Sequence, residues 1–369
     1  MGNRATDERL EKLKESGKTI YSISRLDTIN RCLYEAYRTY ILNERGENNV
    51  YAMLGGKVHD VLEAIVNGEA TEADLQPAVN AELEDIELLG LDFPKDRNGG
   101  DSIRNNWTTN MKHFCSTYKS PRNINGELHT EELFIYETSK GHILQGYIDL
   151  YKENKDGTIS IFDYKTSSLY RSEDLKDHGR QLVVYAMGLE QSGLKVRSVN
   201  WIFLKYVTIE FMGKKTAKAK NETLISKIIE RRKIAQEMAP YVERDLYVLG
   251  YDEFDSEIII SDFKEKNSFD VLPVEIKDKY KVKPCVYEYE LTDEIKQECE
   301  DYINTTIEKW ENCKDYPPRS FTKIQKNGKE VQDWYFCSSL CSHFKNCPYI
   351  QEYLDRLNAE TSSGDDLFS

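Results

Sequence analysis

The chain has 369 residues, enough for one large domain with insertions or for two smaller domains. Apolar residues make up 39% and aromatic residues 11% of it, which is typical of folded rather than disordered chains. The net charge of −14 opposes long-range attraction to phosphate, so nucleic acid would have to meet local basic patches. The candidates are KKTAKAK at 214–220 and RSFTKIQKNGK at 319–329, and each is explained equally well as a solvated surface.

The sequence has no apolar run near the ~18 residues that a membrane helix needs, and its polar N-terminus lacks the apolar stretch of a signal peptide. We therefore expect a cytoplasmic protein without a membrane partner. In that reducing compartment, clustered cysteines are read as metal ligands before disulfides. Four of the eight cysteines are scattered and are expected to be core or incidental residues: Cys115, Cys285, Cys299 and Cys313.

Helices are predicted first along the chain, at 21–45, 55–67, 71–90 and 101–119. Strands follow at 130–137, 142–152 and 158–166, with a hairpin turn at Asp156–Gly157. A helix at 172–191 and a strand at 196–211 come next. Beyond these we expect helices at 221–247 and 292–313, and the pattern suggests strands at 256–261 and 284–291. This order predicts an α/β fold with a mixed central sheet.

Four regions are predicted on this basis. The first, 1–120, is helical, and the second, 121–212, is a catalytic core. A C-terminal region with clustered cysteines spans 213–358, and a disordered tail spans 359–369.

The stretch GYIDLYKENKDGTISIFDYKTSS, residues 146–168, carries the chemistry of the predicted hairpin. Strand side chains alternate, so Asp163 and Lys165 point to one side, and Asp149 can lie opposite them. Two carboxylates can hold a hard cation such as Mg²⁺, and a neighbouring lysine can orient water or stabilise developing charge. An exposed Lys–Asp ion pair is the simpler interpretation. Ile159 and Ile161 weaken that interpretation, because they lie on the same face of the strand as Asp163 and Lys165. Charged residues at the end of an otherwise apolar strand face are costly to bury and are common at active sites.

Four motifs in order resemble the PD-(D/E)xK nuclease superfamily, and more narrowly its RecB/AddB-type exonuclease branch, which is related to the CRISPR-adaptation iron–sulfur nucleases. A helical histidine, G-x-x-D, D-x-K and Q-x-x-x-Y are matched by GGKVHDVLEA, GYID, DYK and QLVVY. The resemblance spans about residues 20–350 and implies a restriction-endonuclease-like core. The residues that it matches are His59, Asp149, Asp163, Lys165, Gln181 and Tyr185.

The resemblance also implies the roles of these residues. Asp149 and Asp163 would be metal ligands together with the backbone carbonyl of Tyr164, and His59 would be an additional ligand. Lys165 would be the catalytic lysine, with Gln181 and Tyr185 bracing the site or contacting substrate. Taken without the other motifs, His59 is better explained as a histidine on a helix face, and Tyr185 equally well as a core residue. Glu132 could add a carboxylate but is better explained as a solvated strand residue.

A cysteine cluster, FCSSLCSHFKNCPYI at 336–350, presents three thiols within eleven residues. Zinc could use Cys337, Cys341 and Cys347 with His343, although a single residue between Cys341 and His343 is tight for a tetrahedral site. The thiols could also be unligated. The resemblance implies a third arrangement, in which one cysteine before the core and three after it hold a [4Fe–4S] cluster, and the first of these is matched by Cys32. The C-x₃-C spacing departs from the C-x₂-C that is common in the family.

Such a cluster would join Cys32 to Cys337 across 305 residues and act as a structural clamp around the core. The expected protein is thus a Mg²⁺- or Mn²⁺-dependent deoxyribonuclease, an exonuclease on single strands or free ends, of the kind used in DNA repair or recombination. The chain has no P-loop, so a helicase would be a separate partner. The alternative is a nuclease-inactive DNA-processing or partner-binding subunit on the same fold. The C-terminal DDLFS resembles short peptides that dock on replication or repair proteins.

Overall fold

The computed structural model describes residues 7–96, 98–121, 126–214, 221–325 and 327–365. Its centre is a sheet in which β1 pairs parallel with β3, β4 pairs parallel with β5, and the other pairs are antiparallel. This mixed sheet, with helices on both faces, confirms the predicted α/β class. Its strands are β1 Ile20–Tyr21, β2 Glu127–Glu137, β3 Ile143–Glu153, β4 Thr158–Lys165, β5 Lys195–Gly213, β6 Thr223–Glu230 and β7 Lys281–Tyr289.

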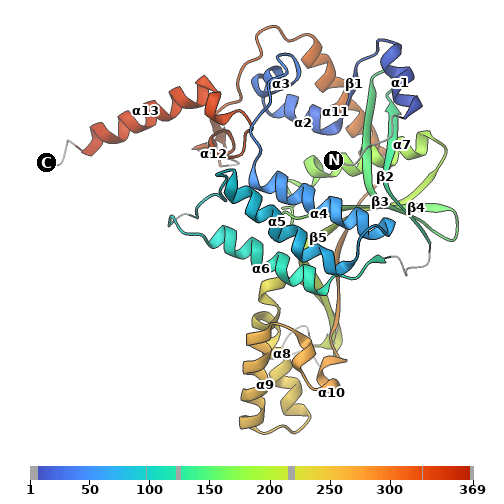
Figure 1. Cartoon of the computed structure of the whole chain (residues 1–369), viewed down its shortest axis with the longest axis vertical. Coiled ribbons are helices and arrows are strands. Elements are labelled where there is room, and N and C mark those ends of the chain that lie inside the picture. The colour runs from blue at the N-terminus through green and yellow to red at the C-terminus, as the bar shows by residue number, and fades with distance from the viewer. Residues whose placement is uncertain (1–6, 97, 122–125, 215–220, 326, 366–369) are drawn as a thin grey trace.

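One face of the sheet is covered by α4 Val50–Asn67, α5 Leu75–Leu88 and α6 Ser102–Thr117 (Figure 1). In α4, Val58, Leu62 and Ile65 recur at helical spacing and are fully buried. The Asn49 side chain caps the first turn, and Gly68, with a φ of 89°, ends the helix in the left-handed conformation. This packing fixes the helix that carries His59 against the sheet.

The opposite face is covered by α7 Leu175–Gln191, with α2 Ile23–Arg31, α3 Leu33–Tyr40 and α11 Asp293–Glu311 packed around it. Two glycines let α7 approach its neighbours closely. A Cβ at Gly188 would lie 2.5 Å from the Phe134 ring on β2, and one at Gly179 would collide with the Tyr289 ring on β7. The helix that carries the Q-x-x-x-Y motif is therefore held at short range on both sides.

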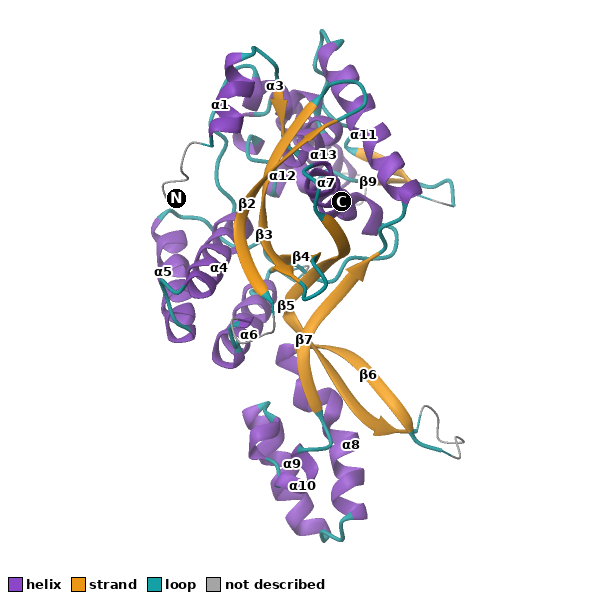
Figure 2. Ribbon diagram, turned by 90° about the vertical axis from the view of Figure 1, so that its right-hand side faces the viewer, coloured by secondary structure: helices purple, strands orange, loops and turns teal. Residues whose placement is uncertain are grey.

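A helical lobe projects from the core on the extended strands β5, β6 and β7 (Figure 2). It consists of α8 Ile234–Val248, α9 Glu253–Lys266 and α10 Val274–Lys277. Asn110 of α6 donates its amide to Glu230 over 2.7 Å, and buried Arg231 donates to the Leu204 carbonyl over 2.7 Å. These bonds tie the base of the lobe to the core.

Three secondary-structure predictions were wrong. Residues 223–230 form strand β6 rather than the start of a helix, because the length of β5 offers them a partner. Residues 256–261 lie inside helix α9 rather than in a strand, because Ile260 and Phe263 pack into the lobe with helical spacing. The helix predicted over 21–45 is two helices, and the extended backbone of Cys32 separates them.

The C-terminal part adds β8 Thr322–Ile324, β9 Glu330–Gln332, α12 Tyr335–Ser339 and α13 Pro348–Asp365. It lies against the N-terminal helices: Arg38 donates to the Asn346 carbonyl over 2.8 Å, and the Glu47 amide donates to the Ser342 carbonyl over 2.7 Å. Helix α13 runs to Asp365, within the stretch from residue 359 for which the sequence predicts a disordered tail, and the disorder of that tail stays a prediction. The rest of DDLFS and residues 215–220 of KKTAKAK lie outside the described residues.

The N-terminal region also contains α1, Glu8–Glu15, and a short 3-10 helix, Glu72–Asp74. In the described part of the chain, no helix combines the length and the apolarity needed to cross a membrane. The division of the chain into four regions stays a prediction.

Candidate active site

The predicted carboxylates stand where β3 and β4 cease to pair. The antiparallel ladder ends with Leu150 opposite Phe162. One position further, Asp149 would face Asp163, but no ladder bond joins the strands there, and β4 continues along β5 alone. The end of the ladder leaves the Tyr164 amide free to donate to Asp149 Oδ2 over 3.2 Å. The alternation predicted for the hairpin thus brings both carboxylates to the same fork in the sheet.

Asp149 is linked to helix α4 at this fork. His59 Nδ1 lies 3.2 Å from Asp149 Oδ2. Burial alone would lower the pKa of His59, but the hydrogen bond and charge of Asp149 raise it above its usual value. Burial would likewise raise the pKa of Asp149, but His59, Lys165 and the Tyr164 amide outweigh it and lower that pKa. The pair is therefore held in its charged form.

Asp163 and Lys165 form a second ion pair on the side of the sheet that α7 covers. Their Oδ2 and Nζ atoms are 2.6 Å apart, and the Asp163 side chain is 1% exposed. Burial raises the pKa of Asp163 to about 6 even though Lys165 lowers it, and the charge of Asp149 adds to the rise. Burial would lower the pKa of Lys165, but the two carboxylates keep it raised. Ile159 and Ile161, on the same side of β4, are buried beneath α7.

Helix α7 contributes the last two predicted residues through a short chain of hydrogen bonds. Lys165 Nζ donates to Gln181 Oε1 over 2.9 Å, and Gln181 Nε2 donates to the Tyr185 hydroxyl over 2.7 Å. Gln181 and Tyr185 are one helical turn apart, so both can face β4. The Tyr185 ring also packs against Phe134, so the residue combines a core contact with its hydrogen bond to Gln181.

The structure thus gathers the six predicted residues at the fork in two groups of contacts, which the Tyr164 amide joins through its bond to Asp149: His59 with Asp149, and Asp163 with Lys165, Gln181 and Tyr185. A small cleft opens beside the set on the α4 side, and Glu131 rather than Glu132 lines it. Glu131 lies opposite Asp149 at an irregular position in β2, where its backbone has a φ of 50°. No sequence pattern marks this position. The cleft is lined by His59, Leu62, Glu63, Val66, Thr130, Glu131, Asp149 and Tyr164.

Two aromatic residues near Lys165 were not predicted. The Tyr170 and His178 rings stack with their centroids 3.8 Å apart and their planes 9° apart. Burial raises the pKa of Tyr170 and lowers the pKa of His178. The charge of Lys165 is close enough to lower both pKa values, but its influence is smaller than that of burial. The signal that could have found His178 is its position three residues before Gln181, on the same face of the helix.

The clustered cysteines approach Cys32 at the junction of the N- and C-terminal segments. Cys337 and Cys341 are buried, and Cys32 and Cys347 are half-buried. Burial raises the pKa of Cys337 to about 11, and the nearby charges of Cys32 and Cys347 raise it as well. Burial raises the pKa of Cys341 to about 12, again with Cys32 and Cys337 among its neighbours. His343 Nε2 lies 2.9 Å from the Thr39 hydroxyl, with which it forms a hydrogen bond.

One group of three metal-ligating side chains in the described residues has its ligand atoms within 4.8 Å of one another: Glu127, His129 and Glu153. Glu127 and Glu153 are exposed and face each other across β2 and β3. Glu153 lies four residues beyond Asp149 on β3. This group is therefore separate from the fork.

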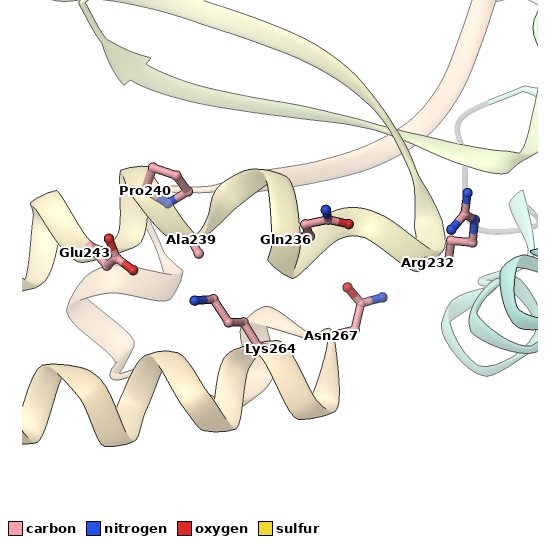
Figure 3. A pocket seen from close by; sticks show the side chains of 7 residues that line it. All are labelled: Arg232, Gln236, Ala239, Pro240, Glu243, Lys264 and Asn267. Atoms are coloured by element: carbon pink, nitrogen blue, oxygen red, sulfur yellow. The ribbon is translucent and has the colours of Figure 1, made fainter.

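The helical lobe has an open cavity of about 530 Å³ between α8 and α9 (Figure 3). Two of its polar side chains are engaged in holding the lobe. Asn267 accepts from the Ala235 amide over 2.8 Å and donates to the Arg231 carbonyl over 2.7 Å, and Arg232 donates to Glu230 over 3.0 Å. Glu243 is the one carboxylate among the lining residues, so this cavity lacks the paired acids of the fork.

The fold has a mixed sheet, two acids where β3 and β4 separate, and a lysine on β4. Together these features define a class of metal-dependent phosphodiesterase folds. The chain belongs to the PD-(D/E)XK nuclease superfamily, whose family model matches residues 20–351. Membership implies a nuclease, a hydrolase that acts on nucleic acid. Among solved structures, the crystal structure of SSO0001 matches with 13% identity, 86% of this chain and 94% of that chain covered, and a TM-score of 0.26. No curated protein matches the chain.

Proposed function

We propose that this protein is a Mg²⁺- or Mn²⁺-dependent deoxyribonuclease of the RecB/AddB-type branch, an exonuclease that acts on single strands or free ends. The observation that carries the proposal is the fork between β3 and β4, where the buried Asp163, the half-buried Asp149 and a lysine meet. A buried, paired set of this kind costs stability unless it serves a purpose, which favours a working site over an incidental ion pair.

The donors at the fork fit a hard divalent cation. Asp149, Asp163 and the carbonyl of Tyr164 offer oxygen, the atom that Mg²⁺ and Mn²⁺ prefer, and His59 offers nitrogen. The metal when bound would supply positive charge that polarises a phosphoryl oxygen and acidifies water. It would also offset the mutual repulsion that helps to hold the pKa of Asp163 near 6.

The protein's own residues have separable roles in this proposal. Gln181 accepts a hydrogen bond from Lys165 and so fixes the ammonium beside Asp163. An ammonium held there can orient attacking water and stabilise negative charge on the phosphate. Tyr185 accepts from Gln181 and keeps the amide in the orientation that Lys165 needs.

We further propose that Cys32, Cys337, Cys341 and Cys347 hold a structural [4Fe–4S] cluster. The support for this proposal is that the four thiols approach one another at one junction. The charges of Cys32 and Cys347 reach Cys337, and that of Cys32 reaches Cys341. Four thiolates satisfy a [4Fe–4S] cluster, and zinc bound by clustered thiols is the alternative.

The test compares two conservative substitutions in one hairpin. Labelled single-stranded DNA is incubated with Mg²⁺ or Mn²⁺ and the wild type, Asp163→Asn or Asp156→Asn. The first variant should lose cleavage, and the second should keep it, because Asn-Gly retains the turn while removing a remote carboxylate. Cleavage that persists in Asp163→Asn refutes the site. A wild type that binds DNA but cleaves it with neither metal supports the alternative, a nuclease-inactive subunit.

A further inference from the structure

The site-facing side of α7 ends in an aromatic pair that the proposed chemistry does not use. Tyr170, in the loop after β4, packs edge-on against Trp201 and Phe203, with centroids 5.0 and 5.2 Å away. Both of those rings are buried in the core. His178 lies flat on Tyr170 at 3.8 Å, and its side chain is exposed. One face of the imidazole is therefore covered by an anchored ring, and the other is turned toward solvent.

The position of this pair relative to the site follows from helix geometry. His178 precedes Gln181 by three residues, so the two side chains share a face and are separated by about 4.5 Å along the helix axis. Gln181 in turn accepts from Lys165 Nζ over 2.9 Å. The exposed ring thus stands about one helical turn from the group that holds the catalytic lysine.

We propose that the exposed face of His178 is a stacking platform for a nucleobase of single-stranded nucleic acid, beside the phosphodiester bond at Lys165. The proposal rests on the proposed nuclease function and extends it to how the strand is held. A base in an intact duplex already stacks on its neighbours, so the platform discriminates in favour of unpaired bases.

The charge of the chain makes such a contact important. With a net charge of −14, long-range attraction to phosphate is weak, and the strand must be held by contacts at short range. Stacking is a contact of that kind, and it involves no counterion release. Burial and the neighbouring Lys165 lower the pKa of His178, so the ring is neutral near pH 7 and adds no charge to the contact.

The experiment compares His178→Phe with His178→Leu in the full chain carrying Asp163→Ala, which prevents cleavage. Both replacements are apolar and similar in size, but only phenylalanine keeps an aromatic face. The probe is a fluorescein-labelled single strand, titrated at several salt concentrations. We expect the Phe variant to bind like the His178 parent and the Leu variant to bind about 5- to 150-fold more weakly, the range for loss of one base–aromatic stack. The loss should be the same at every salt concentration, because no phosphate contact changes.

Two further readouts make the result specific. Binding of a covalently closed duplex should be equal in all three chains. A 2-aminopurine moved along the single strand should be quenched at one position by the His178 parent and by the His178→Phe variant, and this quenching should be lost with His178→Leu. Equal single-strand affinity in His178→Phe and His178→Leu overturns the platform alone. Failure of the His178 parent to bind any DNA overturns the proposed function and the platform together.

Discussion

Gln181 is the residue through which α7 positions Lys165, the lysine to which the proposed function assigns catalysis, and removing Gln181 makes a quantitative prediction. Gln181→Ala deletes the acceptor 2.9 Å from Lys165 Nζ and the donor 2.7 Å from the Tyr185 hydroxyl. A hydrogen bond to a charged group contributes about 1.5–3 kcal/mol and a neutral one about 1 kcal/mol. Because Lys165 is still 20% exposed, water can replace part of the first. We expect unfolding to become about 2–3 kcal/mol easier, measured by denaturant titration.

The effect on catalysis should distinguish the hydrogen bond between Lys165 and Gln181 from the one between Gln181 and Tyr185. If about 2 kcal/mol of lysine positioning is lost, kcat should fall about 30-fold in Gln181→Ala with little change in KM. Tyr185→Phe leaves the bond between Lys165 and Gln181 intact, so its loss should stay below about fivefold. Because Tyr185 acts through Gln181, the double variant should be no worse than Gln181→Ala.

A matched control exists on the same helix. Gln191 also makes two hydrogen bonds, to the amide and carbonyl of Glu137, but it lies at the far end of α7 from Lys165. Gln191→Ala should therefore affect stability modestly and leave kcat unchanged. The reasoning would be refuted if Gln191→Ala lowered kcat as much as Gln181→Ala, or if Tyr185→Phe lowered it equally.

Three other outcomes follow from the site and the cysteines. The folded pKa of Asp163, about 6, lies above its ordinary 3.8, so its contribution to stability is fully present below about pH 4 and is lost as the pH rises through 6. With divalent metal removed, the melting temperature of Asp163→Asn should change less between about pH 4 and 6 than that of the wild type. Melting temperatures that follow pH in parallel in the two proteins would contradict this prediction. Mn²⁺ at about 100 times its dissociation constant should stabilise the wild type by about 2.7 kcal/mol in thermal unfolding. Equal stabilisation of Asp149→Asn by Mn²⁺ would exclude Asp149 as a metal ligand. Cys32→Ser should lose iron and melt at a lower temperature, whereas Cys313→Ser should not, and iron analysis showing full content in Cys32→Ser would refute the cluster.

The fork could be predicted from the sequence because local rules determine it. A three-residue loop, 155–157, with Gly157 at a φ of 76°, sets the register of the hairpin. Alternation along β4 puts Asp163 and Lys165 on the side of Ile159 and Ile161. No distant part of the chain is needed for either step. The same locality explains why α4 and α7, with their regular apolar spacing, were predicted with only small errors at their ends.

The features that were missed depend on partners far away in the sequence. Residues 223–230 have the composition of a helix or a strand, and only the extra length of β5 decides between them. His178 looks like any exposed helical residue until Tyr170 folds back beneath it. Glu131 faces the cleft only because its backbone takes a positive φ. In each case the deciding interaction is tertiary, so no local pattern carries it.

The cysteine junction and the fork are connected through the back of α7. Helix α2, which Cys32 follows directly, packs against α7 and α11. There the Tyr302 hydroxyl of α11 donates to Asp27 of α2 over 3.0 Å, and the guanidinium of Arg180 on α7 lies over the Tyr302 ring at 3.9 Å. Arg180 is the residue next to Gln181. A cluster that fixes the end of α2 would therefore support the helix that positions Lys165, while Asp149 and Asp163 are held by the sheet itself. The clamp would act on catalysis through the lysine rather than through the metal ligands.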